Sequence, residues 1–302
     1  MNLLIVGLGS IAKKHIIAVR SKLQAVKIYA LRSSESVTNY EDIINVWSIS
    51  ELSAVKIDFA IISNPTSQHL STLKNLLVLH CPLFIEKPLA DSLDMYDILS
   101  EVEEKGIMTY VACNLRFLDS IRFVKDEICK GNKRLNEVNV YCGSYLPDWR
   151  PGNYRDYYSA KPELGGGVHL DLIHELDYIY WLFGQPLSVS KILTNNSSID
   201  LNAFDYANYT LGYKNFSASV ILNYYRRDPK RNLELIFDDA TWQVDLRQNS
   251  VVSDGRTLFE SKQTIADTYT DQMNYFIEII KNKKSSFNSI KDSYNVLKIC
   301  LT

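Results

Sequence analysis

Short apolar runs alternate with amphipathic stretches over the first 116 residues, a pattern typical of strand–helix–strand units that build a parallel sheet. The predicted strands cover 3–6, 27–31, 59–62, 83–85 and 109–112. The predicted helices between them cover 11–21, 69–79 and 91–105. This part of the chain therefore predicts an α/β domain with a parallel sheet, which we place at 1–118.

The pattern changes from about residue 137, where longer strands rich in Val, Tyr, Asn and Ser are joined by short polar turns, as in an antiparallel sheet. These strands are predicted over 136–145, 206–213, 217–225 and 232–237. One apolar helix is predicted over 168–183, entered from three glycines and ended by Gly184, and two more over 264–282 and 289–300. We expect a second α/β domain over 119–302, whose last helix can pack back on the first domain.

Composition narrows the class of protein. The 302 residues, 46% of them hydrophobic, are enough for two cores, and a formal net charge of -2 gives no reason to expect a nucleic acid partner. The five scattered cysteines have no C-x-x-C spacing, so we expect no metal site and a reducing cytoplasm. The N-terminal apolar run breaks at Gly7, unlike a signal peptide, and no stretch reaches the ~20 apolar residues of a membrane span. We expect a soluble, cytoplasmic protein that does not bind membranes.

A glycine-rich turn follows the first strand directly and opens the first helix. It reads G-x-G-x-x-A, with Gly7, Gly9, Ser10, Ile11 and Ala12 as its candidate contacts. In a dinucleotide-binding fold the first glycine makes the tight turn, the second lets backbone approach a pyrophosphate, and the small third residue lets helix pack on strand. The anion then lies at the helix N-terminus. The alternative is a glycine-rich turn without a ligand.

The end of the second strand indicates which dinucleotide is preferred. Acidic residues at this place accept hydrogen bonds from the adenosine ribose of NAD, whereas Arg suits a 2′-phosphate. Here Arg32, Ser33 and Ser34 come before any acid, the first of which is Glu35. The sequence therefore favours NADP(H) over NAD(H), unless Arg32 stacks on the adenine or points to solvent.

Several further motifs occur in a fixed order along residues 1–186. They are Asn64-Pro65 with His69, Glu86-Lys87-Pro88, Asn114-x-Arg116-Phe117, and a glycine triplet followed by His174, Asp177, Trp181 and Gly184. Together with the glycine-rich turn they resemble the glucose–fructose oxidoreductase, inositol dehydrogenase and rhizopine-catabolism (Gfo/Idh/MocA) family. The resemblance implies a Rossmann domain followed by an α/β domain with a large open, mainly antiparallel sheet. We expect a homodimer or homotetramer through that sheet, because one face would otherwise expose more apolar area than monomers tolerate.

The resemblance also implies an activity, a dehydrogenase or reductase of the EC 1.1.1 type that moves a hydride between a sugar CH–OH group and a nicotinamide. Segment 149–163 (WRPGNYRDYYSAKPE) is similar to bacterial members near surface-polysaccharide sugar genes, which implies a sugar or nucleotide-sugar substrate. Lys87 corresponds to the family's catalytic lysine. Asp171 and His174 lie on one face of the predicted helix, so the carboxylate could orient a proton-transferring imidazole, although the common family spacing is four residues rather than three.

Other residues follow from these placements. The expected cofactor contacts beyond the turn and Arg32 are Ser33, Asn64, Pro65, His69, Glu86, Lys87 and Asn114. The expected substrate contacts are Lys87, Arg116, Arg155, Tyr158, Asp171 and His174. The resemblance allows a cis peptide bond before Pro88. Two other functions stay open, namely a glycosidase of the same scaffold that retains NAD and a catalytically silent nucleotide-binding sensor.

Overall fold

The chain folds into two compact units in the computed structural model, which describes residues 1–33, 40, 42–131 and 133–302. The first unit is Met1–Ala112 with Tyr269–Leu297, and the second is Cys113–Thr268 with Lys298–Thr302. The sequence placed the division at 118 and all later residues in one domain, whereas the structure adds 269–297 to the first unit. Ser34 and Glu35, which follow the predicted cofactor-contacting arginine, lie outside the described residues. Among the described helices, none has the length and apolar composition to span a membrane.

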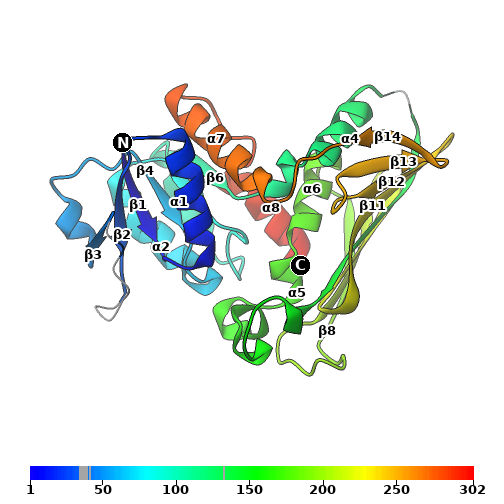
Figure 1. Ribbon diagram of the computed structural model, residues 1–302, viewed down its shortest axis with the longest axis horizontal. Coiled ribbons are helices and arrows are strands. Elements are labelled where there is room, and N and C mark those ends of the chain that lie inside the picture. Colours follow the sequence, from blue (N-terminus) through cyan, green and yellow to red (C-terminus); the bar gives the residue numbers. More distant parts are fainter. Residues whose placement is uncertain (34–39, 41, 132) are drawn as a thin grey trace. The chain divides into compact units, whose positions relative to one another are not determined.

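A six-stranded parallel sheet forms the centre of the first unit (Figure 1). Its strands are β1 (Asn2–Val6), β2 (Lys27–Leu31), β3 (Ile43–Val46), β4 (Phe59–Ile62), β5 (Leu83–Ile85) and β6 (Thr109–Val111). They lie in the order β3-β2-β1-β4-β5-β6, with every neighbouring pair parallel. The central strands β1, β4 and β5 are almost wholly apolar and buried, as expected of strands covered on both faces. Their carboxyl ends meet at one edge, where open α/β sheets bind ligands.

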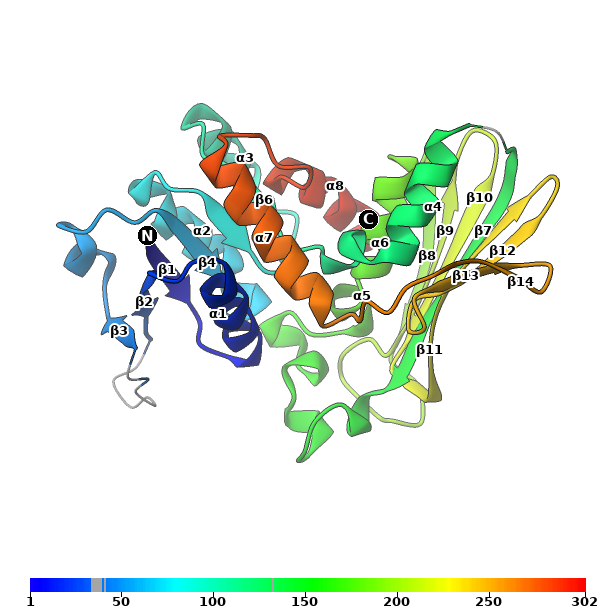
Figure 2. The ribbon, with the colours of Figure 1, turned by 45° about the horizontal axis from the view of Figure 1, so that its top comes forward.

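The helices of this unit cover the parallel sheet. They are α1 (Ser10–Lys22), α2 (His69–Leu76), α3 (Tyr96–Glu104), α7 (Asp267–Lys281) and α8 (Ile290–Leu301). Figure 2 shows the course of helix α7. It packs on the sheet through Phe276, whose ring centre lies 5.8 Å from that of Phe59, 5.3 Å from that of Phe84 and 5.9 Å from that of Tyr110. Helix α3 begins at Tyr96 rather than at residue 91.

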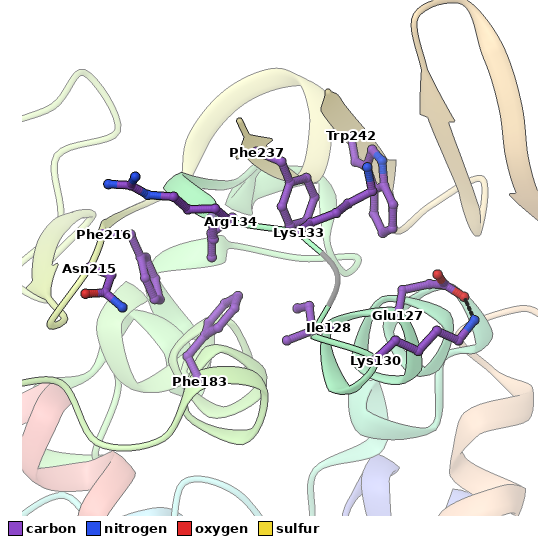
Figure 3. A pocket seen from close by; sticks show the side chains of 11 residues that line it. Glu127, Ile128, Lys130, Lys133, Arg134, Phe183, Asn215, Phe216, Phe237 and Trp242 are labelled. Atoms are coloured by element: carbon purple, nitrogen blue, oxygen red, sulfur yellow. Dashed lines mark hydrogen bonds and ion pairs between the residues drawn. The ribbon is translucent and has the colours of Figure 1, made fainter. Parts of the chain in front are cut away.

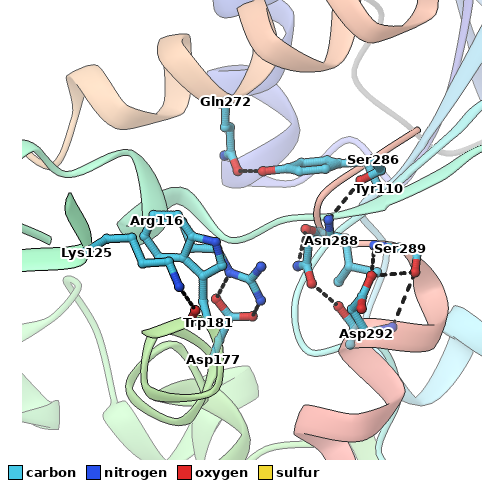
Figure 4. A network of polar contacts seen from close by, with 12 residues as sticks. Tyr110, Arg116, Lys125, Asp177, Trp181, Gln272, Ser286, Asn288, Ser289 and Asp292 are labelled. Atoms are coloured by element: carbon cyan, nitrogen blue, oxygen red, sulfur yellow. Dashed lines mark hydrogen bonds and ion pairs between the residues drawn. The ribbon is translucent and has the colours of Figure 1, made fainter. Parts of the chain in front are cut away.

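The buried side chain of Asn288 joins the segment between α7 and α8 to the edge of the parallel sheet (Figure 4). Its amide nitrogen donates to the Val111 carbonyl at 2.9 Å, and the Val111 N–H donates to the Asn288 carbonyl at 2.9 Å. Ser293 also donates its hydroxyl to the Asn288 side chain at 3.2 Å. This pairing extends the backbone hydrogen bonding of β6 and explains why residues 269–297 belong to the first unit.

The second unit is an eight-stranded sheet with helices on one face (Figures 1 and 2). Its strands are β7 (Leu135–Tyr145), β8 (Ser188–Thr194), β9 (Tyr206–Gly212), β10 (Ser217–Asn223), β11 (Tyr225–Phe237), β12 (Thr241–Asp245), β13 (Ser250–Ser253) and β14 (Arg256–Glu260). Their order is β14-β13-β12-β11-β7-β10-β9-β8, and among the described strands of this second sheet only β10 and β7 pair in parallel. Helices α4 (Asp119–Cys129) and α6 (His174–Phe183) cover one face. The predicted fold class, α/β with a parallel sheet followed by a mainly antiparallel one, is confirmed.

The outer face of this sheet is more polar than expected. Alternate side chains of the central strands are buried under the helices, namely Val138, Val140, Leu211 and Val220. Their neighbours on the outer face are exposed or half-buried, namely Glu137, Asn139, Thr210, Ser217 and Ser219. The same outer face also carries the exposed Ile192, and the expected oligomer through this sheet stays a prediction.

The helix predicted over 168–183 is interrupted. Helix α5 (Val168–Asp171) ends at Leu172, whose φ of -99° and ψ of 27° leave the helical region, and α6 begins at His174. The prediction of one continuous helix is therefore wrong, and with it the argument that a continuous helical face brings Asp171 and His174 together.

Candidate cofactor and catalytic site

The turn between β1 and α1 has the geometry of a phosphate-binding turn. Gly7 has a φ of +87°, and a Cβ there would lie 2.6 Å from the Asn64 backbone nitrogen, so this position excludes side chains. Gly9 is the N-cap of α1, and a Cβ added to it would meet nothing within 4 Å. The first turn of α1 has neither a side-chain cap nor an acidic residue, and Ala12 is fully buried. The unpaired N–H groups of Ser10 and its neighbours therefore open onto free space that fits a pyrophosphate.

Arg32 and Ser33 follow β2 at the same edge of the sheet. The backbone N–H of Arg32 donates to the Val46 carbonyl at 2.9 Å, and its guanidinium lies 3.5 Å from the Asn45 side-chain oxygen. The Arg32 side chain is half-buried and Ser33 is exposed. Arg32 and Ser33 therefore supply a cation and a hydroxyl at the carboxyl end of β2, where the sequence predicts contacts to the adenosine ribose.

A buried carboxylate–imidazole pair lies just before Lys87. Glu86 Oε1 contacts His15 Nε2, and Glu86 Oε2 accepts a hydrogen bond from the Lys87 N–H at 3.1 Å. His15 is fully buried and Glu86 is 7% exposed. Burial opposes ionisation of Glu86, but the His15 contact and the Lys87 ammonium hold the pKa of the carboxyl below its ordinary value. Glu86, expected to contact the cofactor, instead fixes the backbone from which Lys87 projects.

His69 connects the loops that follow β4 and β5. Its Nδ1 lies 3.0 Å from the Pro88 carbonyl oxygen, and its Nε2 lies 3.0 Å from the Asn64 carbonyl oxygen. Burial lowers the pKa of His69, and these carbonyl contacts oppose that shift. The Lys87–Pro88 bond is cis. His69, also expected at the cofactor, therefore braces the loop that carries Lys87.

Asn64 and Pro65 form the beginning of the loop after β4. The Asn64 amide nitrogen donates to the Thr72 hydroxyl at 2.8 Å, while its buried Oδ1 has no hydrogen-bond partner. Pro65 is the N-cap of the short 3₁₀ turn Thr66–Gln68. A buried acceptor without a partner beside the Gly7 turn suits a hydroxyl donor from a bound dinucleotide.

In the second unit, Asp171 and His174 lie on either side of the break between α5 and α6. Both side chains are half-buried. Asp171 Oδ2 accepts a hydrogen bond of 2.6 Å from the Tyr224 hydroxyl. Sequence reasoning did not identify Tyr224, because nothing local marks a tyrosine 53 residues away as a partner of this carboxylate.

Arg116 and Asn114 both form hydrogen bonds to other residues of the second unit. Arg116 is 2% exposed, and its Nε and NH2 donate to the two carboxylate oxygens of Asp177 at 2.8 and 2.7 Å (Figure 4). Asn114 is 3% exposed and donates to the Thr268 hydroxyl at 2.8 Å. The geometry favours bracing roles for both, in place of the substrate and cofactor contacts expected from the sequence.

The remaining predicted substrate residues lie in the loops before the glycine triplet. Arg155 is exposed, and its guanidinium lies 3.3 Å from the Asp200 carboxylate. The Tyr158 hydroxyl donates to the Gly165 carbonyl at 2.9 Å. The Tyr158 hydroxyl therefore fixes the segment that leads into α5, while Arg155 lies at the surface, with its guanidinium also 4.8 Å from the centre of the Tyr154 ring.

A second buried ion pair, also missed by sequence reasoning, holds α6 against the sheet. Arg231 Nε on β11 donates to Glu175 Oε1 at 2.6 Å, and Glu175 is fully buried. Glu175 directly follows His174, so this pair and the Arg116–Asp177 pair fix the start of α6 from two directions. Sequence reasoning had no signal for it, because the two residues are 56 positions apart.

An aromatic cavity of about 330 Å³ lies elsewhere in the second unit (Figure 3). Rings of Phe183, Phe216, Phe237 and Trp242 line it, and Lys133 and Arg134 stand at its edge. None of the predicted site residues lines it, so it is separate from the candidate site.

Comparison with known proteins agrees with these features. Residues 1–112 match a family described as the Gfo/Idh/MocA oxidoreductase family with an NAD-binding Rossmann fold, and residues 132–244 match a Gfo/Idh/MocA C-terminal domain. An uncharacterized oxidoreductase, YrbE of Bacillus subtilis strain 168, is 26% identical over 239 residues, 72% of this chain. That match spans 65% of YrbE, and two further relatives are matched over 54% and 44% of their lengths, so the chain covers less than two thirds of each.

Solved structures resemble the whole chain at low sequence identity. The UDP-N-acetylglucosamine 3-dehydrogenase GnnA from Acidithiobacillus ferrooxidans is 18% identical with a TM-score of 0.79, over 100% of this chain and 95% of that one. A levoglucosan dehydrogenase in complex with NADH and levoglucosan is 15% identical with a TM-score of 0.84, over 99% of this chain and 95% of that one. The shared fold agrees with the family match in both halves. The chain therefore belongs to the Gfo/Idh/MocA family of oxidoreductases, with an NAD-binding Rossmann fold in its N-terminal part.

Proposed function

We propose that the protein is an NAD(P)-dependent dehydrogenase or reductase that acts on a CH–OH group of a sugar or nucleotide sugar, with NADP(H) as the preferred cofactor. One observation carries the proposal. In the first unit, the glycine turn that suits a pyrophosphate follows the carboxyl end of β1. Lys87 follows the carboxyl end of β5, where its backbone N–H donates to Glu86, which also contacts His15. A lysine braced in this way, beside a dinucleotide turn, suits chemistry on an alcohol oxygen.

The cofactor site has contacts for both ends of a dinucleotide. The first turn of α1 would hold the pyrophosphate, and Asn64 Oδ1 would accept from a ribose hydroxyl. Arg32 and Ser33 would hold a 2′-phosphate, which is the basis for the NADP(H) preference. When bound, the nicotinamide supplies or accepts the hydride.

The protein's own residues would handle the charge and the proton. The Lys87 ammonium would stabilise negative charge on the reacting oxygen, and His174 would take or return its proton. Asp171 would orient the His174 imidazole. For both to act, Lys87 of the first unit and His174 of the second must reach the same substrate hydroxyl.

The substrate class rests on comparison with relatives. GnnA is named for UDP-N-acetylglucosamine, and the levoglucosan dehydrogenase was solved with an anhydrosugar. The likeness of segment 149–163 to bacterial surface-sugar dehydrogenases supports a role in making such sugars. Nucleotide-activated sugars are therefore the first substrates to test.

The experiment is a screen of free and nucleotide-activated sugars with NADP(H) and NAD(H), followed by absorbance at 340 nm. We expect a net absorbance change with a sugar. Lys87→Met and His174→Ala should each lower turnover at least ~100-fold with cofactor affinity near normal, because each removes an acid–base or charge-stabilising group. Lys105→Met, at an exposed surface pair with Glu101, is the control and should retain full turnover.

Three results would contradict the proposal. Sugar release without net absorbance change would indicate an NAD-retaining glycosidase. Cofactor binding without any turnover would indicate a sensor. A His174→Ala variant within tenfold of the parent would remove His174 from proton transfer.

A further inference from the structure

We propose that Tyr224 is a positioning residue for the reaction, which fixes the Asp171 carboxylate that orients His174. This inference rests on the function proposed above. It is carried by the hydrogen bond from the buried Tyr224 hydroxyl to Asp171 Oδ2 and by the contacts that hold the tyrosine in place.

The backbone of Tyr224 is held on both sides. It is the single residue between β10 and β11, its N–H donates to the Asp205 carbonyl at 3.0 Å, and its carbonyl accepts from the Leu146 N–H at 2.8 Å. The ring of Trp149 packs edge-on against its ring, with centroids 5.4 Å apart. Tyr224 is fully buried, so its side chain has little freedom to move.

The hydroxyl of Tyr224 stays protonated and remains a hydrogen-bond donor to Asp171. A buried hydroxyl without an acceptor is costly, and hydrogen bonds to a carboxylate are short and strong, as the 2.6 Å distance is here. Burial, and then the Asp171 charge, raise the pKa of Tyr224 well above its ordinary value. Tyr224 therefore keeps its proton, which suits a positioning role and not proton transfer.

The helix break gives this contact its role. Asp171 is the last residue of α5 and His174 is the first of α6, and the backbone leaves the helical region at Leu172 between them, so regular helix geometry does not by itself set the direction of the two side chains. The Tyr224 hydroxyl fixes one carboxylate oxygen and thereby the plane of the Asp171 side chain. Within the same unit, His169 beside Asp171 and Tyr158 beside Tyr224 are titratable groups that also act electrostatically on these two residues.

The test is Tyr224→Phe, which removes only the hydroxyl, compared with Tyr209→Phe. Tyr209 is also fully buried in the second unit, and its hydroxyl donates to the Cys300 carbonyl at 3.2 Å, so the control loses a similar hydrogen bond without involving Asp171. The first readout is the ¹³C NMR chemical shift of the Asp171 carboxyl at one fixed pH, which needs no turnover. Because Tyr224→Phe removes the hydroxyl that donates to this carboxylate, the Asp171 resonance should move in Tyr224→Phe and not in Tyr209→Phe.

The second readout separates kcat from KM and from cofactor affinity. Tyr224→Phe should lower kcat by about 10- to 100-fold, because a misplaced group weakens the transition state more than the ground state, and NADP(H) affinity should not change. In an Asp171→Asn background the same substitution should have little further effect on kcat, because the two residues act as one unit. A merely structural tyrosine would lower kcat equally in both backgrounds.

The outcomes distinguish this inference from the function on which it rests. An unchanged Asp171 carboxyl resonance in Tyr224→Phe, or additive losses of kcat in the double variant, would overturn the positioning role. If the Asp171 resonance moves but the parent protein turns over no sugar with either cofactor, the proposed function fails, and the role of Tyr224 in that reaction fails with it. The hydrogen bond to Asp171 would then stand as structure alone.

Discussion

Replacing Asp177 with Asn should destabilise the second unit strongly. Arg116 and Asp177 have side chains only 2% and 10% exposed, and two hydrogen bonds of 2.8 and 2.7 Å join them. Asp177→Asn removes the charge and leaves the guanidinium buried without a counter-ion. Breaking a buried pair in this way costs about 3–5 kcal/mol, so we expect a loss of at least about 3 kcal/mol in the free energy of unfolding.

The assay is urea unfolding followed by tryptophan fluorescence, because Trp149, Trp181 and Trp242 of the four tryptophans lie in the second unit. Glu101→Gln is the control, since its pair with Lys105 is partly exposed and should contribute less than about 1 kcal/mol. Replacing both partners, as Arg116→Met with Asp177→Leu, should recover much of the loss, because neither charge is then left alone. If the free energy of unfolding of Asp177→Asn lies within about 1 kcal/mol of that of the parent, the Arg116–Asp177 pair does not stabilise the second unit to the expected extent. Arg116 would then be a candidate substrate contact again.

Three further predictions concern the cofactor, pH and assembly. Arg32→Ala should lower NADP(H) affinity by about 10- to 100-fold and leave NAD(H) affinity unchanged in calorimetric titration, because one charge-assisted contact is lost; equal affinities of the parent for both cofactors would contradict this. His169 has its pKa lowered from 6.5 to about 4, first by burial and then by Lys191. The unfolded chain therefore binds a proton that the folded chain does not, and stability should fall by about 3 kcal/mol as pH drops from about 6.5 to about 4. His169→Gln should lack that part of the pH dependence in urea unfolding, and parallel curves for parent and variant would rule the explanation out. Assembly through the outer face of the second sheet stays a prediction, and a light-scattering mass near the 34.6 kDa of one chain would contradict it.

The first unit was predictable because its central strands are continuous apolar runs followed by strong local signals. The Gly7-x-Gly9 turn and the residues after β4 and β5 occur at strand ends, and the carboxyl ends of parallel strands share one edge. The edge strand β3 was not predicted although it reads Ile-Ile-Asn-Val, because an apolar run of four residues is too short to distinguish a strand from a piece of helix. The edge strand β8 was not predicted because none of its residues is buried and its polar and apolar positions do not alternate clearly.

The candidate site was predictable by residue type but not by partner. Lys87, Asp171 and His174 were identifiable in the chain, whereas the side chains that brace this region come from distant segments. They are His15, which contacts Glu86, Tyr224, which contacts Asp171, and Arg231, which contacts Glu175. The break between α5 and α6 has no local signal, because Leu172 and Ile173 are ordinary helix formers. The partners of Arg116 and Asn114 could not be predicted for a related reason, since a polar side chain at a strand end can meet either a ligand or a buried partner, and ligand contacts by these two residues stay predictions.

The position of Phe276 has a consequence for how the protein is made. This ring covers Phe59, Phe84 and Tyr110, so the parallel sheet lacks part of its core until α7 has been synthesised. A nascent chain grows by about 5–20 residues per second, so the N-terminal strands wait on the order of ten seconds or more with this apolar face uncovered. Most of the second unit, Cys113–Thr268, is made before α7 is finished and can begin to fold during that interval, while its last segment, Lys298–Thr302, is made after α7. The part of the chain that is made first therefore completes its core only near the end of synthesis, and its uncovered sheet is the natural target for chaperones during translation.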